Sequence, residues 1–395
     1  MTTVLYSGGD VFNGADPILR DHAVLVDGDS IQDVGPAEKF ADYQGEKVDT
    51  TGGTVMPGMA DCHVHLVYGG EAVPSAQIEG ANPAEITLRA LEHAQANLKA
   101  GITAVRDCGG HNYLEFPVRD ACNSGRFLGP NIMASGKMIC MTGGHGNRFG
   151  RVADGCDEVV KAVREQIHAG SDLIKIMATG GVMTKGVDPE DAHYSAEELA
   201  AGIGEAKRFR RTTASHAQGA EGIMNAVLGG ITSIEHGIFM DQECLDAMME
   251  RGTYLVPTLA AVKNILVNKN NGIADYVVEK CIRIYEKHVE SFEMFYKAGG
   301  KIAMGTDAGT PFNLHGKNTD ELTYMVECGM SHLDALKSAT SVAHELMQYE
   351  DRGRIKEGFK ADLLIVNGDP EDDIRMAADT ANHRQVIKNG EAVAL

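Results

Sequence analysis

Two histidines separated by one residue close the first apolar stretch in the middle of the chain. This stretch, Met56–His65, ends in Asp-Cys-His-Val-His and so contributes His63 and His65. Side chains two positions apart in a β-strand point to the same face, and two imidazoles on one face can bind a single metal ion. Cys62 then points to the opposite face, where we expect it to pack against helices rather than bind metal.

Further candidate ligands end three later stretches; they are His216, His236 and Asp307. A fourth stretch, Asp172–Met177, places Lys175 in the middle of an apolar run. Each residue alone has an ordinary alternative, because a strand-end histidine is often a hydrogen-bonded core residue and Lys175 could pair with Asp307. Their recurrence at the ends of successive strands favours a bound metal.

The stretches that carry these residues alternate with helical patterns, which predicts an α/β fold of the (β/α)8 TIM-barrel type. The expected strands are Met56–His65, Ile102–Asp107, Asn131–Ser135, Leu173–Met177, Thr213–His216, Ile231–Glu235, Thr253–Thr258 and Lys301–Gly305. The clearest helical patterns are Pro83–Ala100, Asp157–Ala169, Ser195–Phe209, Asp241–Arg251 and Tyr276–Ala298. Such barrels carry their chemistry at the C-terminal ends of the strands. A doubly wound sheet is the competing fold, but no GxGxxG motif follows the first strand.

Both ends of the chain are predicted to be β structure. The β-prone runs there are Ala23–Val26, Ser30–Val34, Ala361–Val366, Gln385–Lys388 and Glu391–Leu395. The last two flank Asn389-Gly390, a pair suited to the type I′ turn of a β-hairpin. We therefore expect a small β domain built from residues 1–57 and 350–395, with the barrel formed by residues 58–349.

Composition limits the partners of this 395-residue chain. Its 36 Lys and Arg against 56 Asp and Glu give a net charge of −20, which opposes binding to nucleic acid or to an anionic membrane surface. No signal peptide and no apolar run of about 18 residues is evident. The eight cysteines form no CxxC pair, so we expect reduced thiols and a cytoplasmic location.

Several of these segments resemble one enzyme superfamily. The run Val55–Leu66 resembles the first-strand motif of the amidohydrolase superfamily, and Lys175, the single histidines and Asp307 follow in that superfamily's order. The segment Gly353–Val366 is similar to the part that re-enters its small β-sandwich. Three further motifs, Gly143–Gly146, Ile174–Gly181 and Ser215–Gly219, resemble the imidazolonepropionase-related branch that contains Xaa-Pro dipeptidases, or prolidases.

The resemblance implies a site for two divalent metal ions. Imidazole and carboxylate ligands suit Zn2+, with Mn2+, Fe2+ or Co2+ as the alternatives. It implies that CO2 converts Lys175 to a carbamate that bridges the two ions. His63 and His65 with Asp307 would bind the more buried ion, and His216 and His236 the more exposed one. A metal-bridging hydroxide would attack the scissile carbonyl, and Asp307 would act as general base and then general acid.

Other residues are candidates for contacting the substrate. Tyr254 resembles the tyrosine that stabilises the oxyanion in the dipeptidase branch, although it could instead pack between barrel and helix. His145, in a glycine-rich loop, is the first candidate for substrate binding, with a solvent-facing turn as the alternative. The weaker candidates are Arg148, His193, Tyr194 and His315.

These features predict a binuclear metal-dependent hydrolase of C–N bonds. Its expected substrate is a dipeptide of the Xaa-Pro or a related type, whose free carboxylate His145 or Arg148 could receive. Opening of a cyclic amide or deamination of a heterocycle, as in imidazolonepropionase-type enzymes, is the alternative. A barrel that has only a structural role is a remote third possibility. We also expect a homo-oligomer that has a small-molecule substrate and no nucleic-acid or membrane partner.

Overall fold

The computed structural model describes residues 3–394, which form two compact units. The first unit contains the chain up to Asp61, the segment Gln95–Ala104 and the chain from Gly316 onward. The second unit contains Cys62–Ala94 and Val105–His315. The domain division 1–57, 58–349 and 350–395 stays a prediction.

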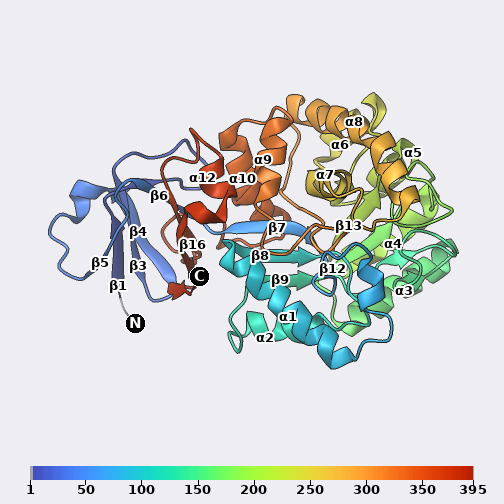
Figure 1. Ribbon diagram of the computed structural model, residues 1–395, viewed down its shortest axis with the longest axis horizontal. Coiled ribbons are helices and arrows are strands. Elements are labelled where there is room, and N and C mark those ends of the chain that lie inside the picture. Colours follow the sequence, from blue (N-terminus) through green and yellow to red (C-terminus); the bar gives the residue numbers. More distant parts are fainter. Residues whose placement is uncertain (1–2, 395) are drawn as a thin grey trace. The chain divides into compact units, whose positions relative to one another are not determined.

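The first unit contains two β-sheets, one made from the N-terminal end of the chain and one made from both ends (Figure 1). One has the order β4-β3-β1-β5, with β1 Thr3–Ser7, β3 His22–Asp27, β4 Ser30–Pro36 and β5 Glu46–Asp49. The other has the order β18-β17-β16-β6-β2, with β2 Asp10–Val11, β6 Gly53–Pro57, β16 Leu363–Asn367, β17 His383–Lys388 and β18 Glu391–Val393. Buried side chains of both sheets, such as Val24 and Ile365, share one apolar cluster, as a β-sandwich would require.

The two hairpins predicted at the chain ends are confirmed. Strands β3 and β4 pair antiparallel around the Asp-Gly-Asp turn, and β17 pairs with β18. Asn389 and Gly390 have φ values of 50° and 78°, as the predicted type I′ turn requires. Leu395, the last residue of the predicted hairpin, lies outside the described residues. The helices of this unit are α9 Asp320–Glu327, α10 His332–Ala339, α11 Ser341–Leu346 and α12 Arg375–Ala378.

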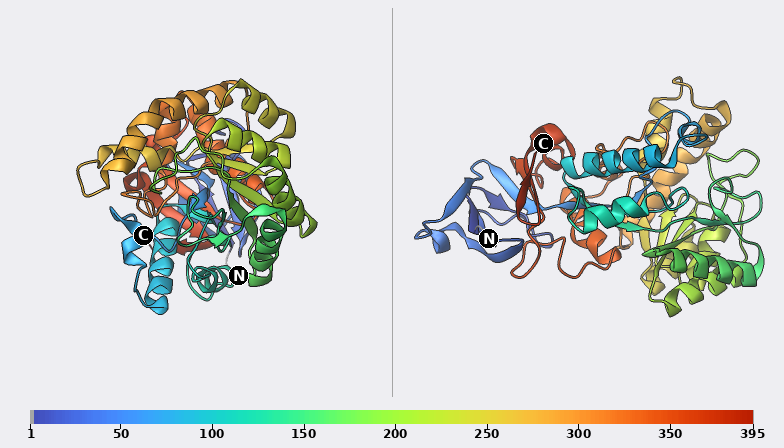
Figure 2. Two further views of the ribbon diagram at one scale, coloured as in Figure 1. Left: turned by 90° about the vertical axis from the view of Figure 1, so that its right-hand side faces the viewer. Right: turned by 90° about the horizontal axis from the view of Figure 1, so that it is seen from below.

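The second unit is built around a six-stranded parallel sheet with the order β11-β10-β12-β13-β14-β15. Its strands are β10 Ile139–Cys140, β11 Arg151–Val152, β12 Leu173–Met177, β13 Thr212–Ala217, β14 Ser233–His236 and β15 Tyr254–Val256. Its helices are α2 Phe116–Asn123, α3 Gly155–Ala169, α4 Ala196–Arg208, α5 Ala220–Gly229, α6 Gln242–Arg251, α7 Leu259–Val267 and α8 Asp275–Lys297. Helices α3 to α6 and α8 lie outside the strands in an arc (Figure 2), whereas α7 borders the cavity described below.

Local sequence signals set the ends of these helices. Ser195 and Glu198 form a capping box at the start of α4, which supplies partners for backbone groups that the helix leaves unpaired. Gly170, Gly230 and Gly252 end α3, α5 and α6 in the left-handed conformation that glycine adopts without a steric penalty. Within residues 3–394, no helix combines the length and the apolarity needed to cross a membrane.

The first strand predicted from the sequence is wrong in its extent. Met56–His65 contributes to two strands in different sheets, because Gly58 interrupts the extended segment between β6 and β7 Met59–Val64. Strand β7 belongs to a three-stranded sheet of order β7-β8-β9, with β8 Ile102–Asp107 and β9 Asn131–Ala134, and α1 Pro83–Lys99 joins β7 to β8. His65 therefore lies just beyond the end of its strand.

The eighth predicted strand, Lys301–Gly305, is not a regular strand. Ile302 forms an isolated parallel bridge with Leu255, and Ala308 forms another with Val64. The Cys62 N–H also donates to the carbonyl of Met304, in this segment, over 2.8 Å. These contacts place residues 301–308 beside both β15 and β7, while closure of the strands into a complete barrel stays a prediction.

Candidate metal centre

The structure brings all six predicted metal ligands to one cavity of about 550 Å3 in the second unit. The six residues are His63, His65, Lys175, His216, His236 and Asp307. They come from β7 and its end, from β12, β13 and β14, and from the segment that follows Gly305. A cavity of this size is ample for a small-molecule substrate.

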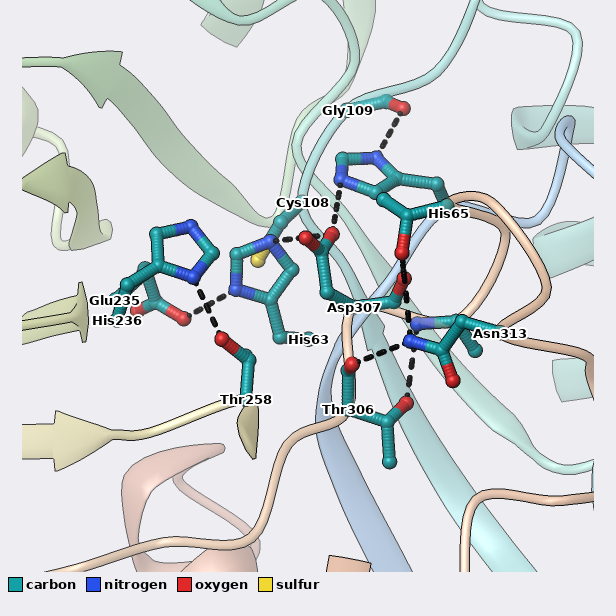
Figure 3. Close-up of polar contacts among 12 residues, drawn as sticks. His63, His65, Cys108, Gly109, Glu235, His236, Thr258, Thr306, Asp307 and Asn313 are labelled. Carbon is teal, nitrogen blue, oxygen red and sulfur yellow. Dashed lines mark hydrogen bonds and ion pairs between the residues drawn. The ribbon is translucent and has the colours of Figure 1, made fainter. Parts of the chain in front are cut away.

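Three of these residues form a tight cluster that suits a metal ion. His65 Nε2 lies 3.0 Å from Asp307 Oδ1, and His63 Nε2 lies 3.5 Å from the same oxygen. One ligand atom from each of the three residues lies within 4.8 Å of the others. Figure 3 shows both imidazoles directed at the Asp307 carboxylate, an arrangement that fits a divalent cation bound by nitrogen and oxygen.

Buried partners orient the two histidines of this cluster. His63 Nδ1–H donates to Glu235 Oε2 over 2.7 Å, and His65 Nδ1–H donates to the Gly109 carbonyl over 2.9 Å. Glu235 in turn accepts hydrogen bonds from Arg106 at 2.8 Å and from Ser233 at 2.6 Å. Each Nδ1 is thus protonated, so Nε2 is the nitrogen of each ring that would bind a metal. Burial alone would lower the pKa of His65, but the Asp307 carboxylate beside its Nε2 raises that pKa.

His216 and His236 are oriented through opposite ring nitrogens. His236 Nδ1–H donates to Thr258 Oγ1 over 2.6 Å, which leaves Nε2 available. His216 Nε2–H donates to the Gly180 carbonyl over 2.9 Å, which leaves Nδ1 available. The two ring centroids lie 4.5 Å apart. Sequence spacing cannot predict this difference, because it depends on which loop lies behind each ring.

Lys175 is buried without a hydrogen-bond partner. The residue is only 2% exposed, and its Nζ makes no hydrogen bond within residues 3–394. No ion pair in that part of the chain joins it to Asp307, the alternative that the sequence left open. A buried ammonium without a partner is costly, whereas a carbamate formed on it would become a metal ligand. The residue therefore fits the ligand role.

Burial and neighbouring charges set the protonation of the cluster. Burial lowers the pKa values of His63, His216 and His236 well below the ordinary value, so these imidazoles are neutral and can donate lone pairs to a metal. Burial alone would raise the pKa of Asp307, but His63 and His65 beside it lower that pKa. The carboxylate is therefore anionic.

Three residues of the site have left-handed backbone conformations. The φ values are 73° for His236, 52° for Thr258 and 63° for Asp307. Residues other than glycine rarely adopt such values, and a β-branched residue such as threonine does so at a particular cost. The chain thus holds strain where it aims these side chains.

Two of the predicted substrate-binding residues, His145 and Arg148, line the cavity. His145 Nδ1 is hydrogen-bonded to Thr184 Oγ1 at 2.8 Å, and its ring centroid lies 4.4 Å from that of His216. Burial lowers the pKa of His145 to about 3, so the ring is neutral. Arg148 is more exposed and pairs with Glu79.

His193, Tyr194 and His315 do not line the cavity. His193 Nδ1 accepts from the backbone N–H of His145 at 3.5 Å, which links it to a residue that lines the cavity. The Tyr194 hydroxyl donates to the Ala153 carbonyl over 2.8 Å. His315 Nε2–H donates to the Tyr68 carbonyl over 3.0 Å. Each of the three side chains is thus hydrogen-bonded to a backbone group of another segment.

The structure does not bring Tyr254 to the metal ligands either. Tyr254 is the first residue of β15 and pairs with Ser233, the first residue of β14, whereas His236 is the last residue of β14. Its hydroxyl accepts a hydrogen bond of 3.3 Å from Lys301. The expected oxyanion role fails because Tyr254 lies at the opposite end of the parallel strands from the ligands.

Sequence reasoning missed the residues behind the ligands. Glu235 and Arg106 are fully buried and charged, and Thr258 is buried at the start of α7. A signal for the first two was present, because each is a charged residue inside an apolar strand sequence. Their pairing with each other required knowledge of which strands are neighbours in space.

A profile named Amidohydrolase family matches residues 54–393. This chain belongs to the amidohydrolase family. The solved structure of a Xaa-Pro dipeptidase with bound methionine is 34% identical, with a TM-score of 0.92 over 100% of both chains. Ochratoxinase of Aspergillus niger is 30% identical over 98% of this chain and 86% of its own length. Imidazolonepropionase of Micrococcus luteus is 28% identical over 89% of this chain and 88% of its own length. These relatives confirm the resemblance drawn from the motifs.

Proposed function

We propose that this amidohydrolase is a binuclear metal-dependent enzyme that cleaves the amide bond of a dipeptide, with Xaa-Pro peptides as the expected substrates. The observation that carries the proposal is the convergence of four histidines, Asp307 and the unpartnered Lys175 on one cavity. The similarity to a Xaa-Pro dipeptidase structure over the whole chain supports the choice of substrate. Family membership also supports a closed (β/α)8 barrel and a terminal β-sandwich.

The donor set fits two divalent cations. His63, His65 and Asp307 would hold one ion, His216 and His236 the other, and a carbamate on Lys175 would be shared. Imidazole and carboxylate ligands favour Zn2+ among the common divalent metals. When bound, such ions polarise the scissile carbonyl and lower the pKa of water.

Asp307 is positioned to move the proton in this reaction. Its carboxylate is anionic and borders the cavity, so it can take a proton from the attacking water and pass it to the amine. The amide C–N bond then breaks to give a carboxylate and a free amine. Tyr254 has no part in the proposed reaction, and His145 is the neutral donor that remains available beside the substrate.

The charges of the cavity favour a substrate that carries an anion. Among the described residues that line the cavity, Asp307 is the only carboxylate, whereas Lys185 contributes a cation and Arg148 a guanidinium that pairs with Glu79. Lys185 is exposed and forms no ion pair in the described part of the chain. A cationic rim on a chain of net charge −20 is suited to the free carboxylate of a dipeptide.

A cyclic amide is the second candidate substrate. The relationship to imidazolonepropionase over most of the chain favours it, because the same donor set can serve either reaction. A purely structural role finds no support, because every predicted ligand position lines the cavity.

A substrate panel tests the proposal. Zn2+-loaded protein is assayed against Xaa-Pro dipeptides, other dipeptides, ochratoxin and imidazolonepropionate, with release of the free amine or ring opening as the readout. Turnover of dipeptides that disappears on chelation and returns with Zn2+ is the expected result. Activity confined to imidazolonepropionate would replace the proposal with the cyclic amide.

A second test addresses Lys175. We expect Lys175→Ala to lose metal and activity and to recover part of both when a short carboxylic acid is supplied. Full activity of the variant without the acid would show that no carbamate is needed.

A further inference from the structure

The loop between β12 and α4 forms one wall of the cavity. The two ends of the loop lie side by side. Thr179 and Ala192 form an antiparallel bridge, and the Gly180 N–H donates to the Asp191 carbonyl over 2.9 Å. Between these points the chain runs along the cavity. The four loop residues that line the cavity are Val182, Met183, Thr184 and Lys185.

This loop contacts the candidate metal centre directly. The Gly180 carbonyl accepts from His216 over 2.9 Å, and the Thr184 hydroxyl bonds to His145 Nδ1 at 2.8 Å. At Gly181 the His145 ring approaches so closely that an added Cβ would lie 2.7 Å from its Nε2. The positions of His216 and His145 therefore depend on the position of the loop.

Helix α8 holds the same loop from the outer side. Tyr276, Lys280 and Arg283 are spaced by four and three residues, so they lie on one face of the helix. The Tyr276 hydroxyl donates to the Met183 carbonyl over 3.1 Å. Arg283 forms an ion pair of 2.7 Å with Glu190 near the loop's end. These contacts tie the loop to α8 along its length.

Lys280 is the centre of this attachment. Its ammonium donates to three loop carbonyls, those of Gly181 at 3.3 Å, Thr184 at 2.9 Å and Val187 at 2.6 Å. An ammonium has three donors, and here each has a separate acceptor. The side chain is only 13% exposed, so water cannot readily take over these bonds. Loss of the ammonium would leave three carbonyls without their donor.

We propose that Lys280 is a positioning residue of the active site. It acts through the loop 180–187, whose fixed conformation orients His216 through Gly180 and His145 through Thr184. The assignment of these contacts to catalysis rests on the proposed function, whereas the dependence of the loop on Lys280 does not. Lys280 itself touches neither the substrate nor a metal.

The test compares Lys280→Met with two other variants of the full-length protein. Lys280→Arg keeps the charge, and Lys287→Met is the matched control, because Lys287 lies on the same helix, is exposed and pairs only with Glu290 in the described residues. Hydrogen exchange of amides 180–187, Zn2+ affinity and the KM and kcat for an Xaa-Pro dipeptide are measured. Thermal unfolding identifies any variant that fails to fold, and Tyr276→Phe then serves as the milder substitute.

For Lys280→Met we expect amide exchange in 180–187 to rise at least about tenfold, with β12 unchanged. We expect Zn2+ affinity to fall about tenfold, as is typical when the support of a ligand is lost. KM should rise more than kcat falls, and Lys280→Arg should restore part of each change. Wild-type exchange and affinity in Lys280→Met would overturn the proposal. Faster exchange and weaker Zn2+ binding in a protein that cleaves no dipeptide would support Lys280 and refute the proposed substrate.

Discussion

The candidate metal centre has two halves that are supported in different ways. The inner half-site, formed by His63, His65 and Asp307, rests on a buried charge pair between Glu235 and Arg106 and on the Gly109 carbonyl. The outer half-site, formed by His216 and His236, rests on a loop carbonyl and a hydroxyl. A buried charge pair on strands thus supports the inner half-site, whereas the outer half-site has only neutral partners, in a loop and at the start of α7.

The largest effect should follow from removal of the charge behind the inner half-site. Glu235→Gln leaves the Arg106 guanidinium buried without a carboxylate, so we expect the free energy of unfolding to fall by about 3 kcal/mol. Urea unfolding of the metal-free protein measures the change. Glu243→Gln, an exposed site on α6, is the control and should change stability little. Equal stability of the two variants would refute the charge-based support of the inner half-site.

Acidification should weaken the structure behind both halves. His288 donates to the Pro257 carbonyl behind the outer half-site, and burial lowers its pKa to about 4. Burial lowers the pKa of His315, behind the inner half-site, to about 3. Histidines in the unfolded chain titrate near 6.5, so below that pH the unfolded state binds more protons and stability falls as pH falls toward the folded-state pKa.

Between pH 7 and pH 5 each of these two histidines should cost about 2 kcal/mol of unfolding free energy in the metal-free protein. Denaturant midpoints across this range measure the slope. His288→Gln should reduce the loss of unfolding free energy between pH 7 and pH 5 by about 2 kcal/mol, the contribution of one histidine. A slope unchanged in that variant would show that His288 is protonated in the folded state.

A smaller effect is expected at the outer half-site. Thr258→Val removes the hydroxyl that accepts from His236, so we expect about 1 kcal/mol less stability and about tenfold weaker Zn2+ binding. A calorimetric titration with Zn2+ measures the affinity. Thr258→Ser keeps the hydroxyl and should bind like the wild type. If serine and valine bind Zn2+ alike, the hydroxyl does not support His236.

The smallest effect is expected at Tyr254, outside both halves. Its hydroxyl contacts Lys301 at the far end of the strands, so Tyr254→Phe should change kcat by less than about twofold, in contrast to the changes at residues that touch substrate. Steady-state kinetics with a dipeptide measures this. A large fall in kcat with KM unchanged would restore the oxyanion role.

The histidine and aspartate ligands could be predicted from sequence because each lies at or just beyond the end of a β-prone run, and such runs meet at one edge in parallel α/β folds. Lys175 could be predicted because it is a cation in the middle of an apolar run. Tyr254 was misplaced although its position near the start of a run indicated the opposite end. The contacts of Lys280 could not be predicted, because its acceptor Gly181 lies 99 residues away in the sequence. The eighth strand was overpredicted, because residues 301–308 pair through isolated bridges instead of a continuous ladder.

The left-handed backbone at Thr258 has a consequence for the evolution and engineering of this enzyme. Glycine or asparagine would relax a φ of 52°, which should gain more than the about 1 kcal/mol that the lost hydrogen bond costs, yet either would remove the threonine hydroxyl that orients His236. Selection for heat resistance alone would therefore favour replacements that impair the metal centre. At this position thermostability and turnover are expected to trade off, and a screen that scores both would show it.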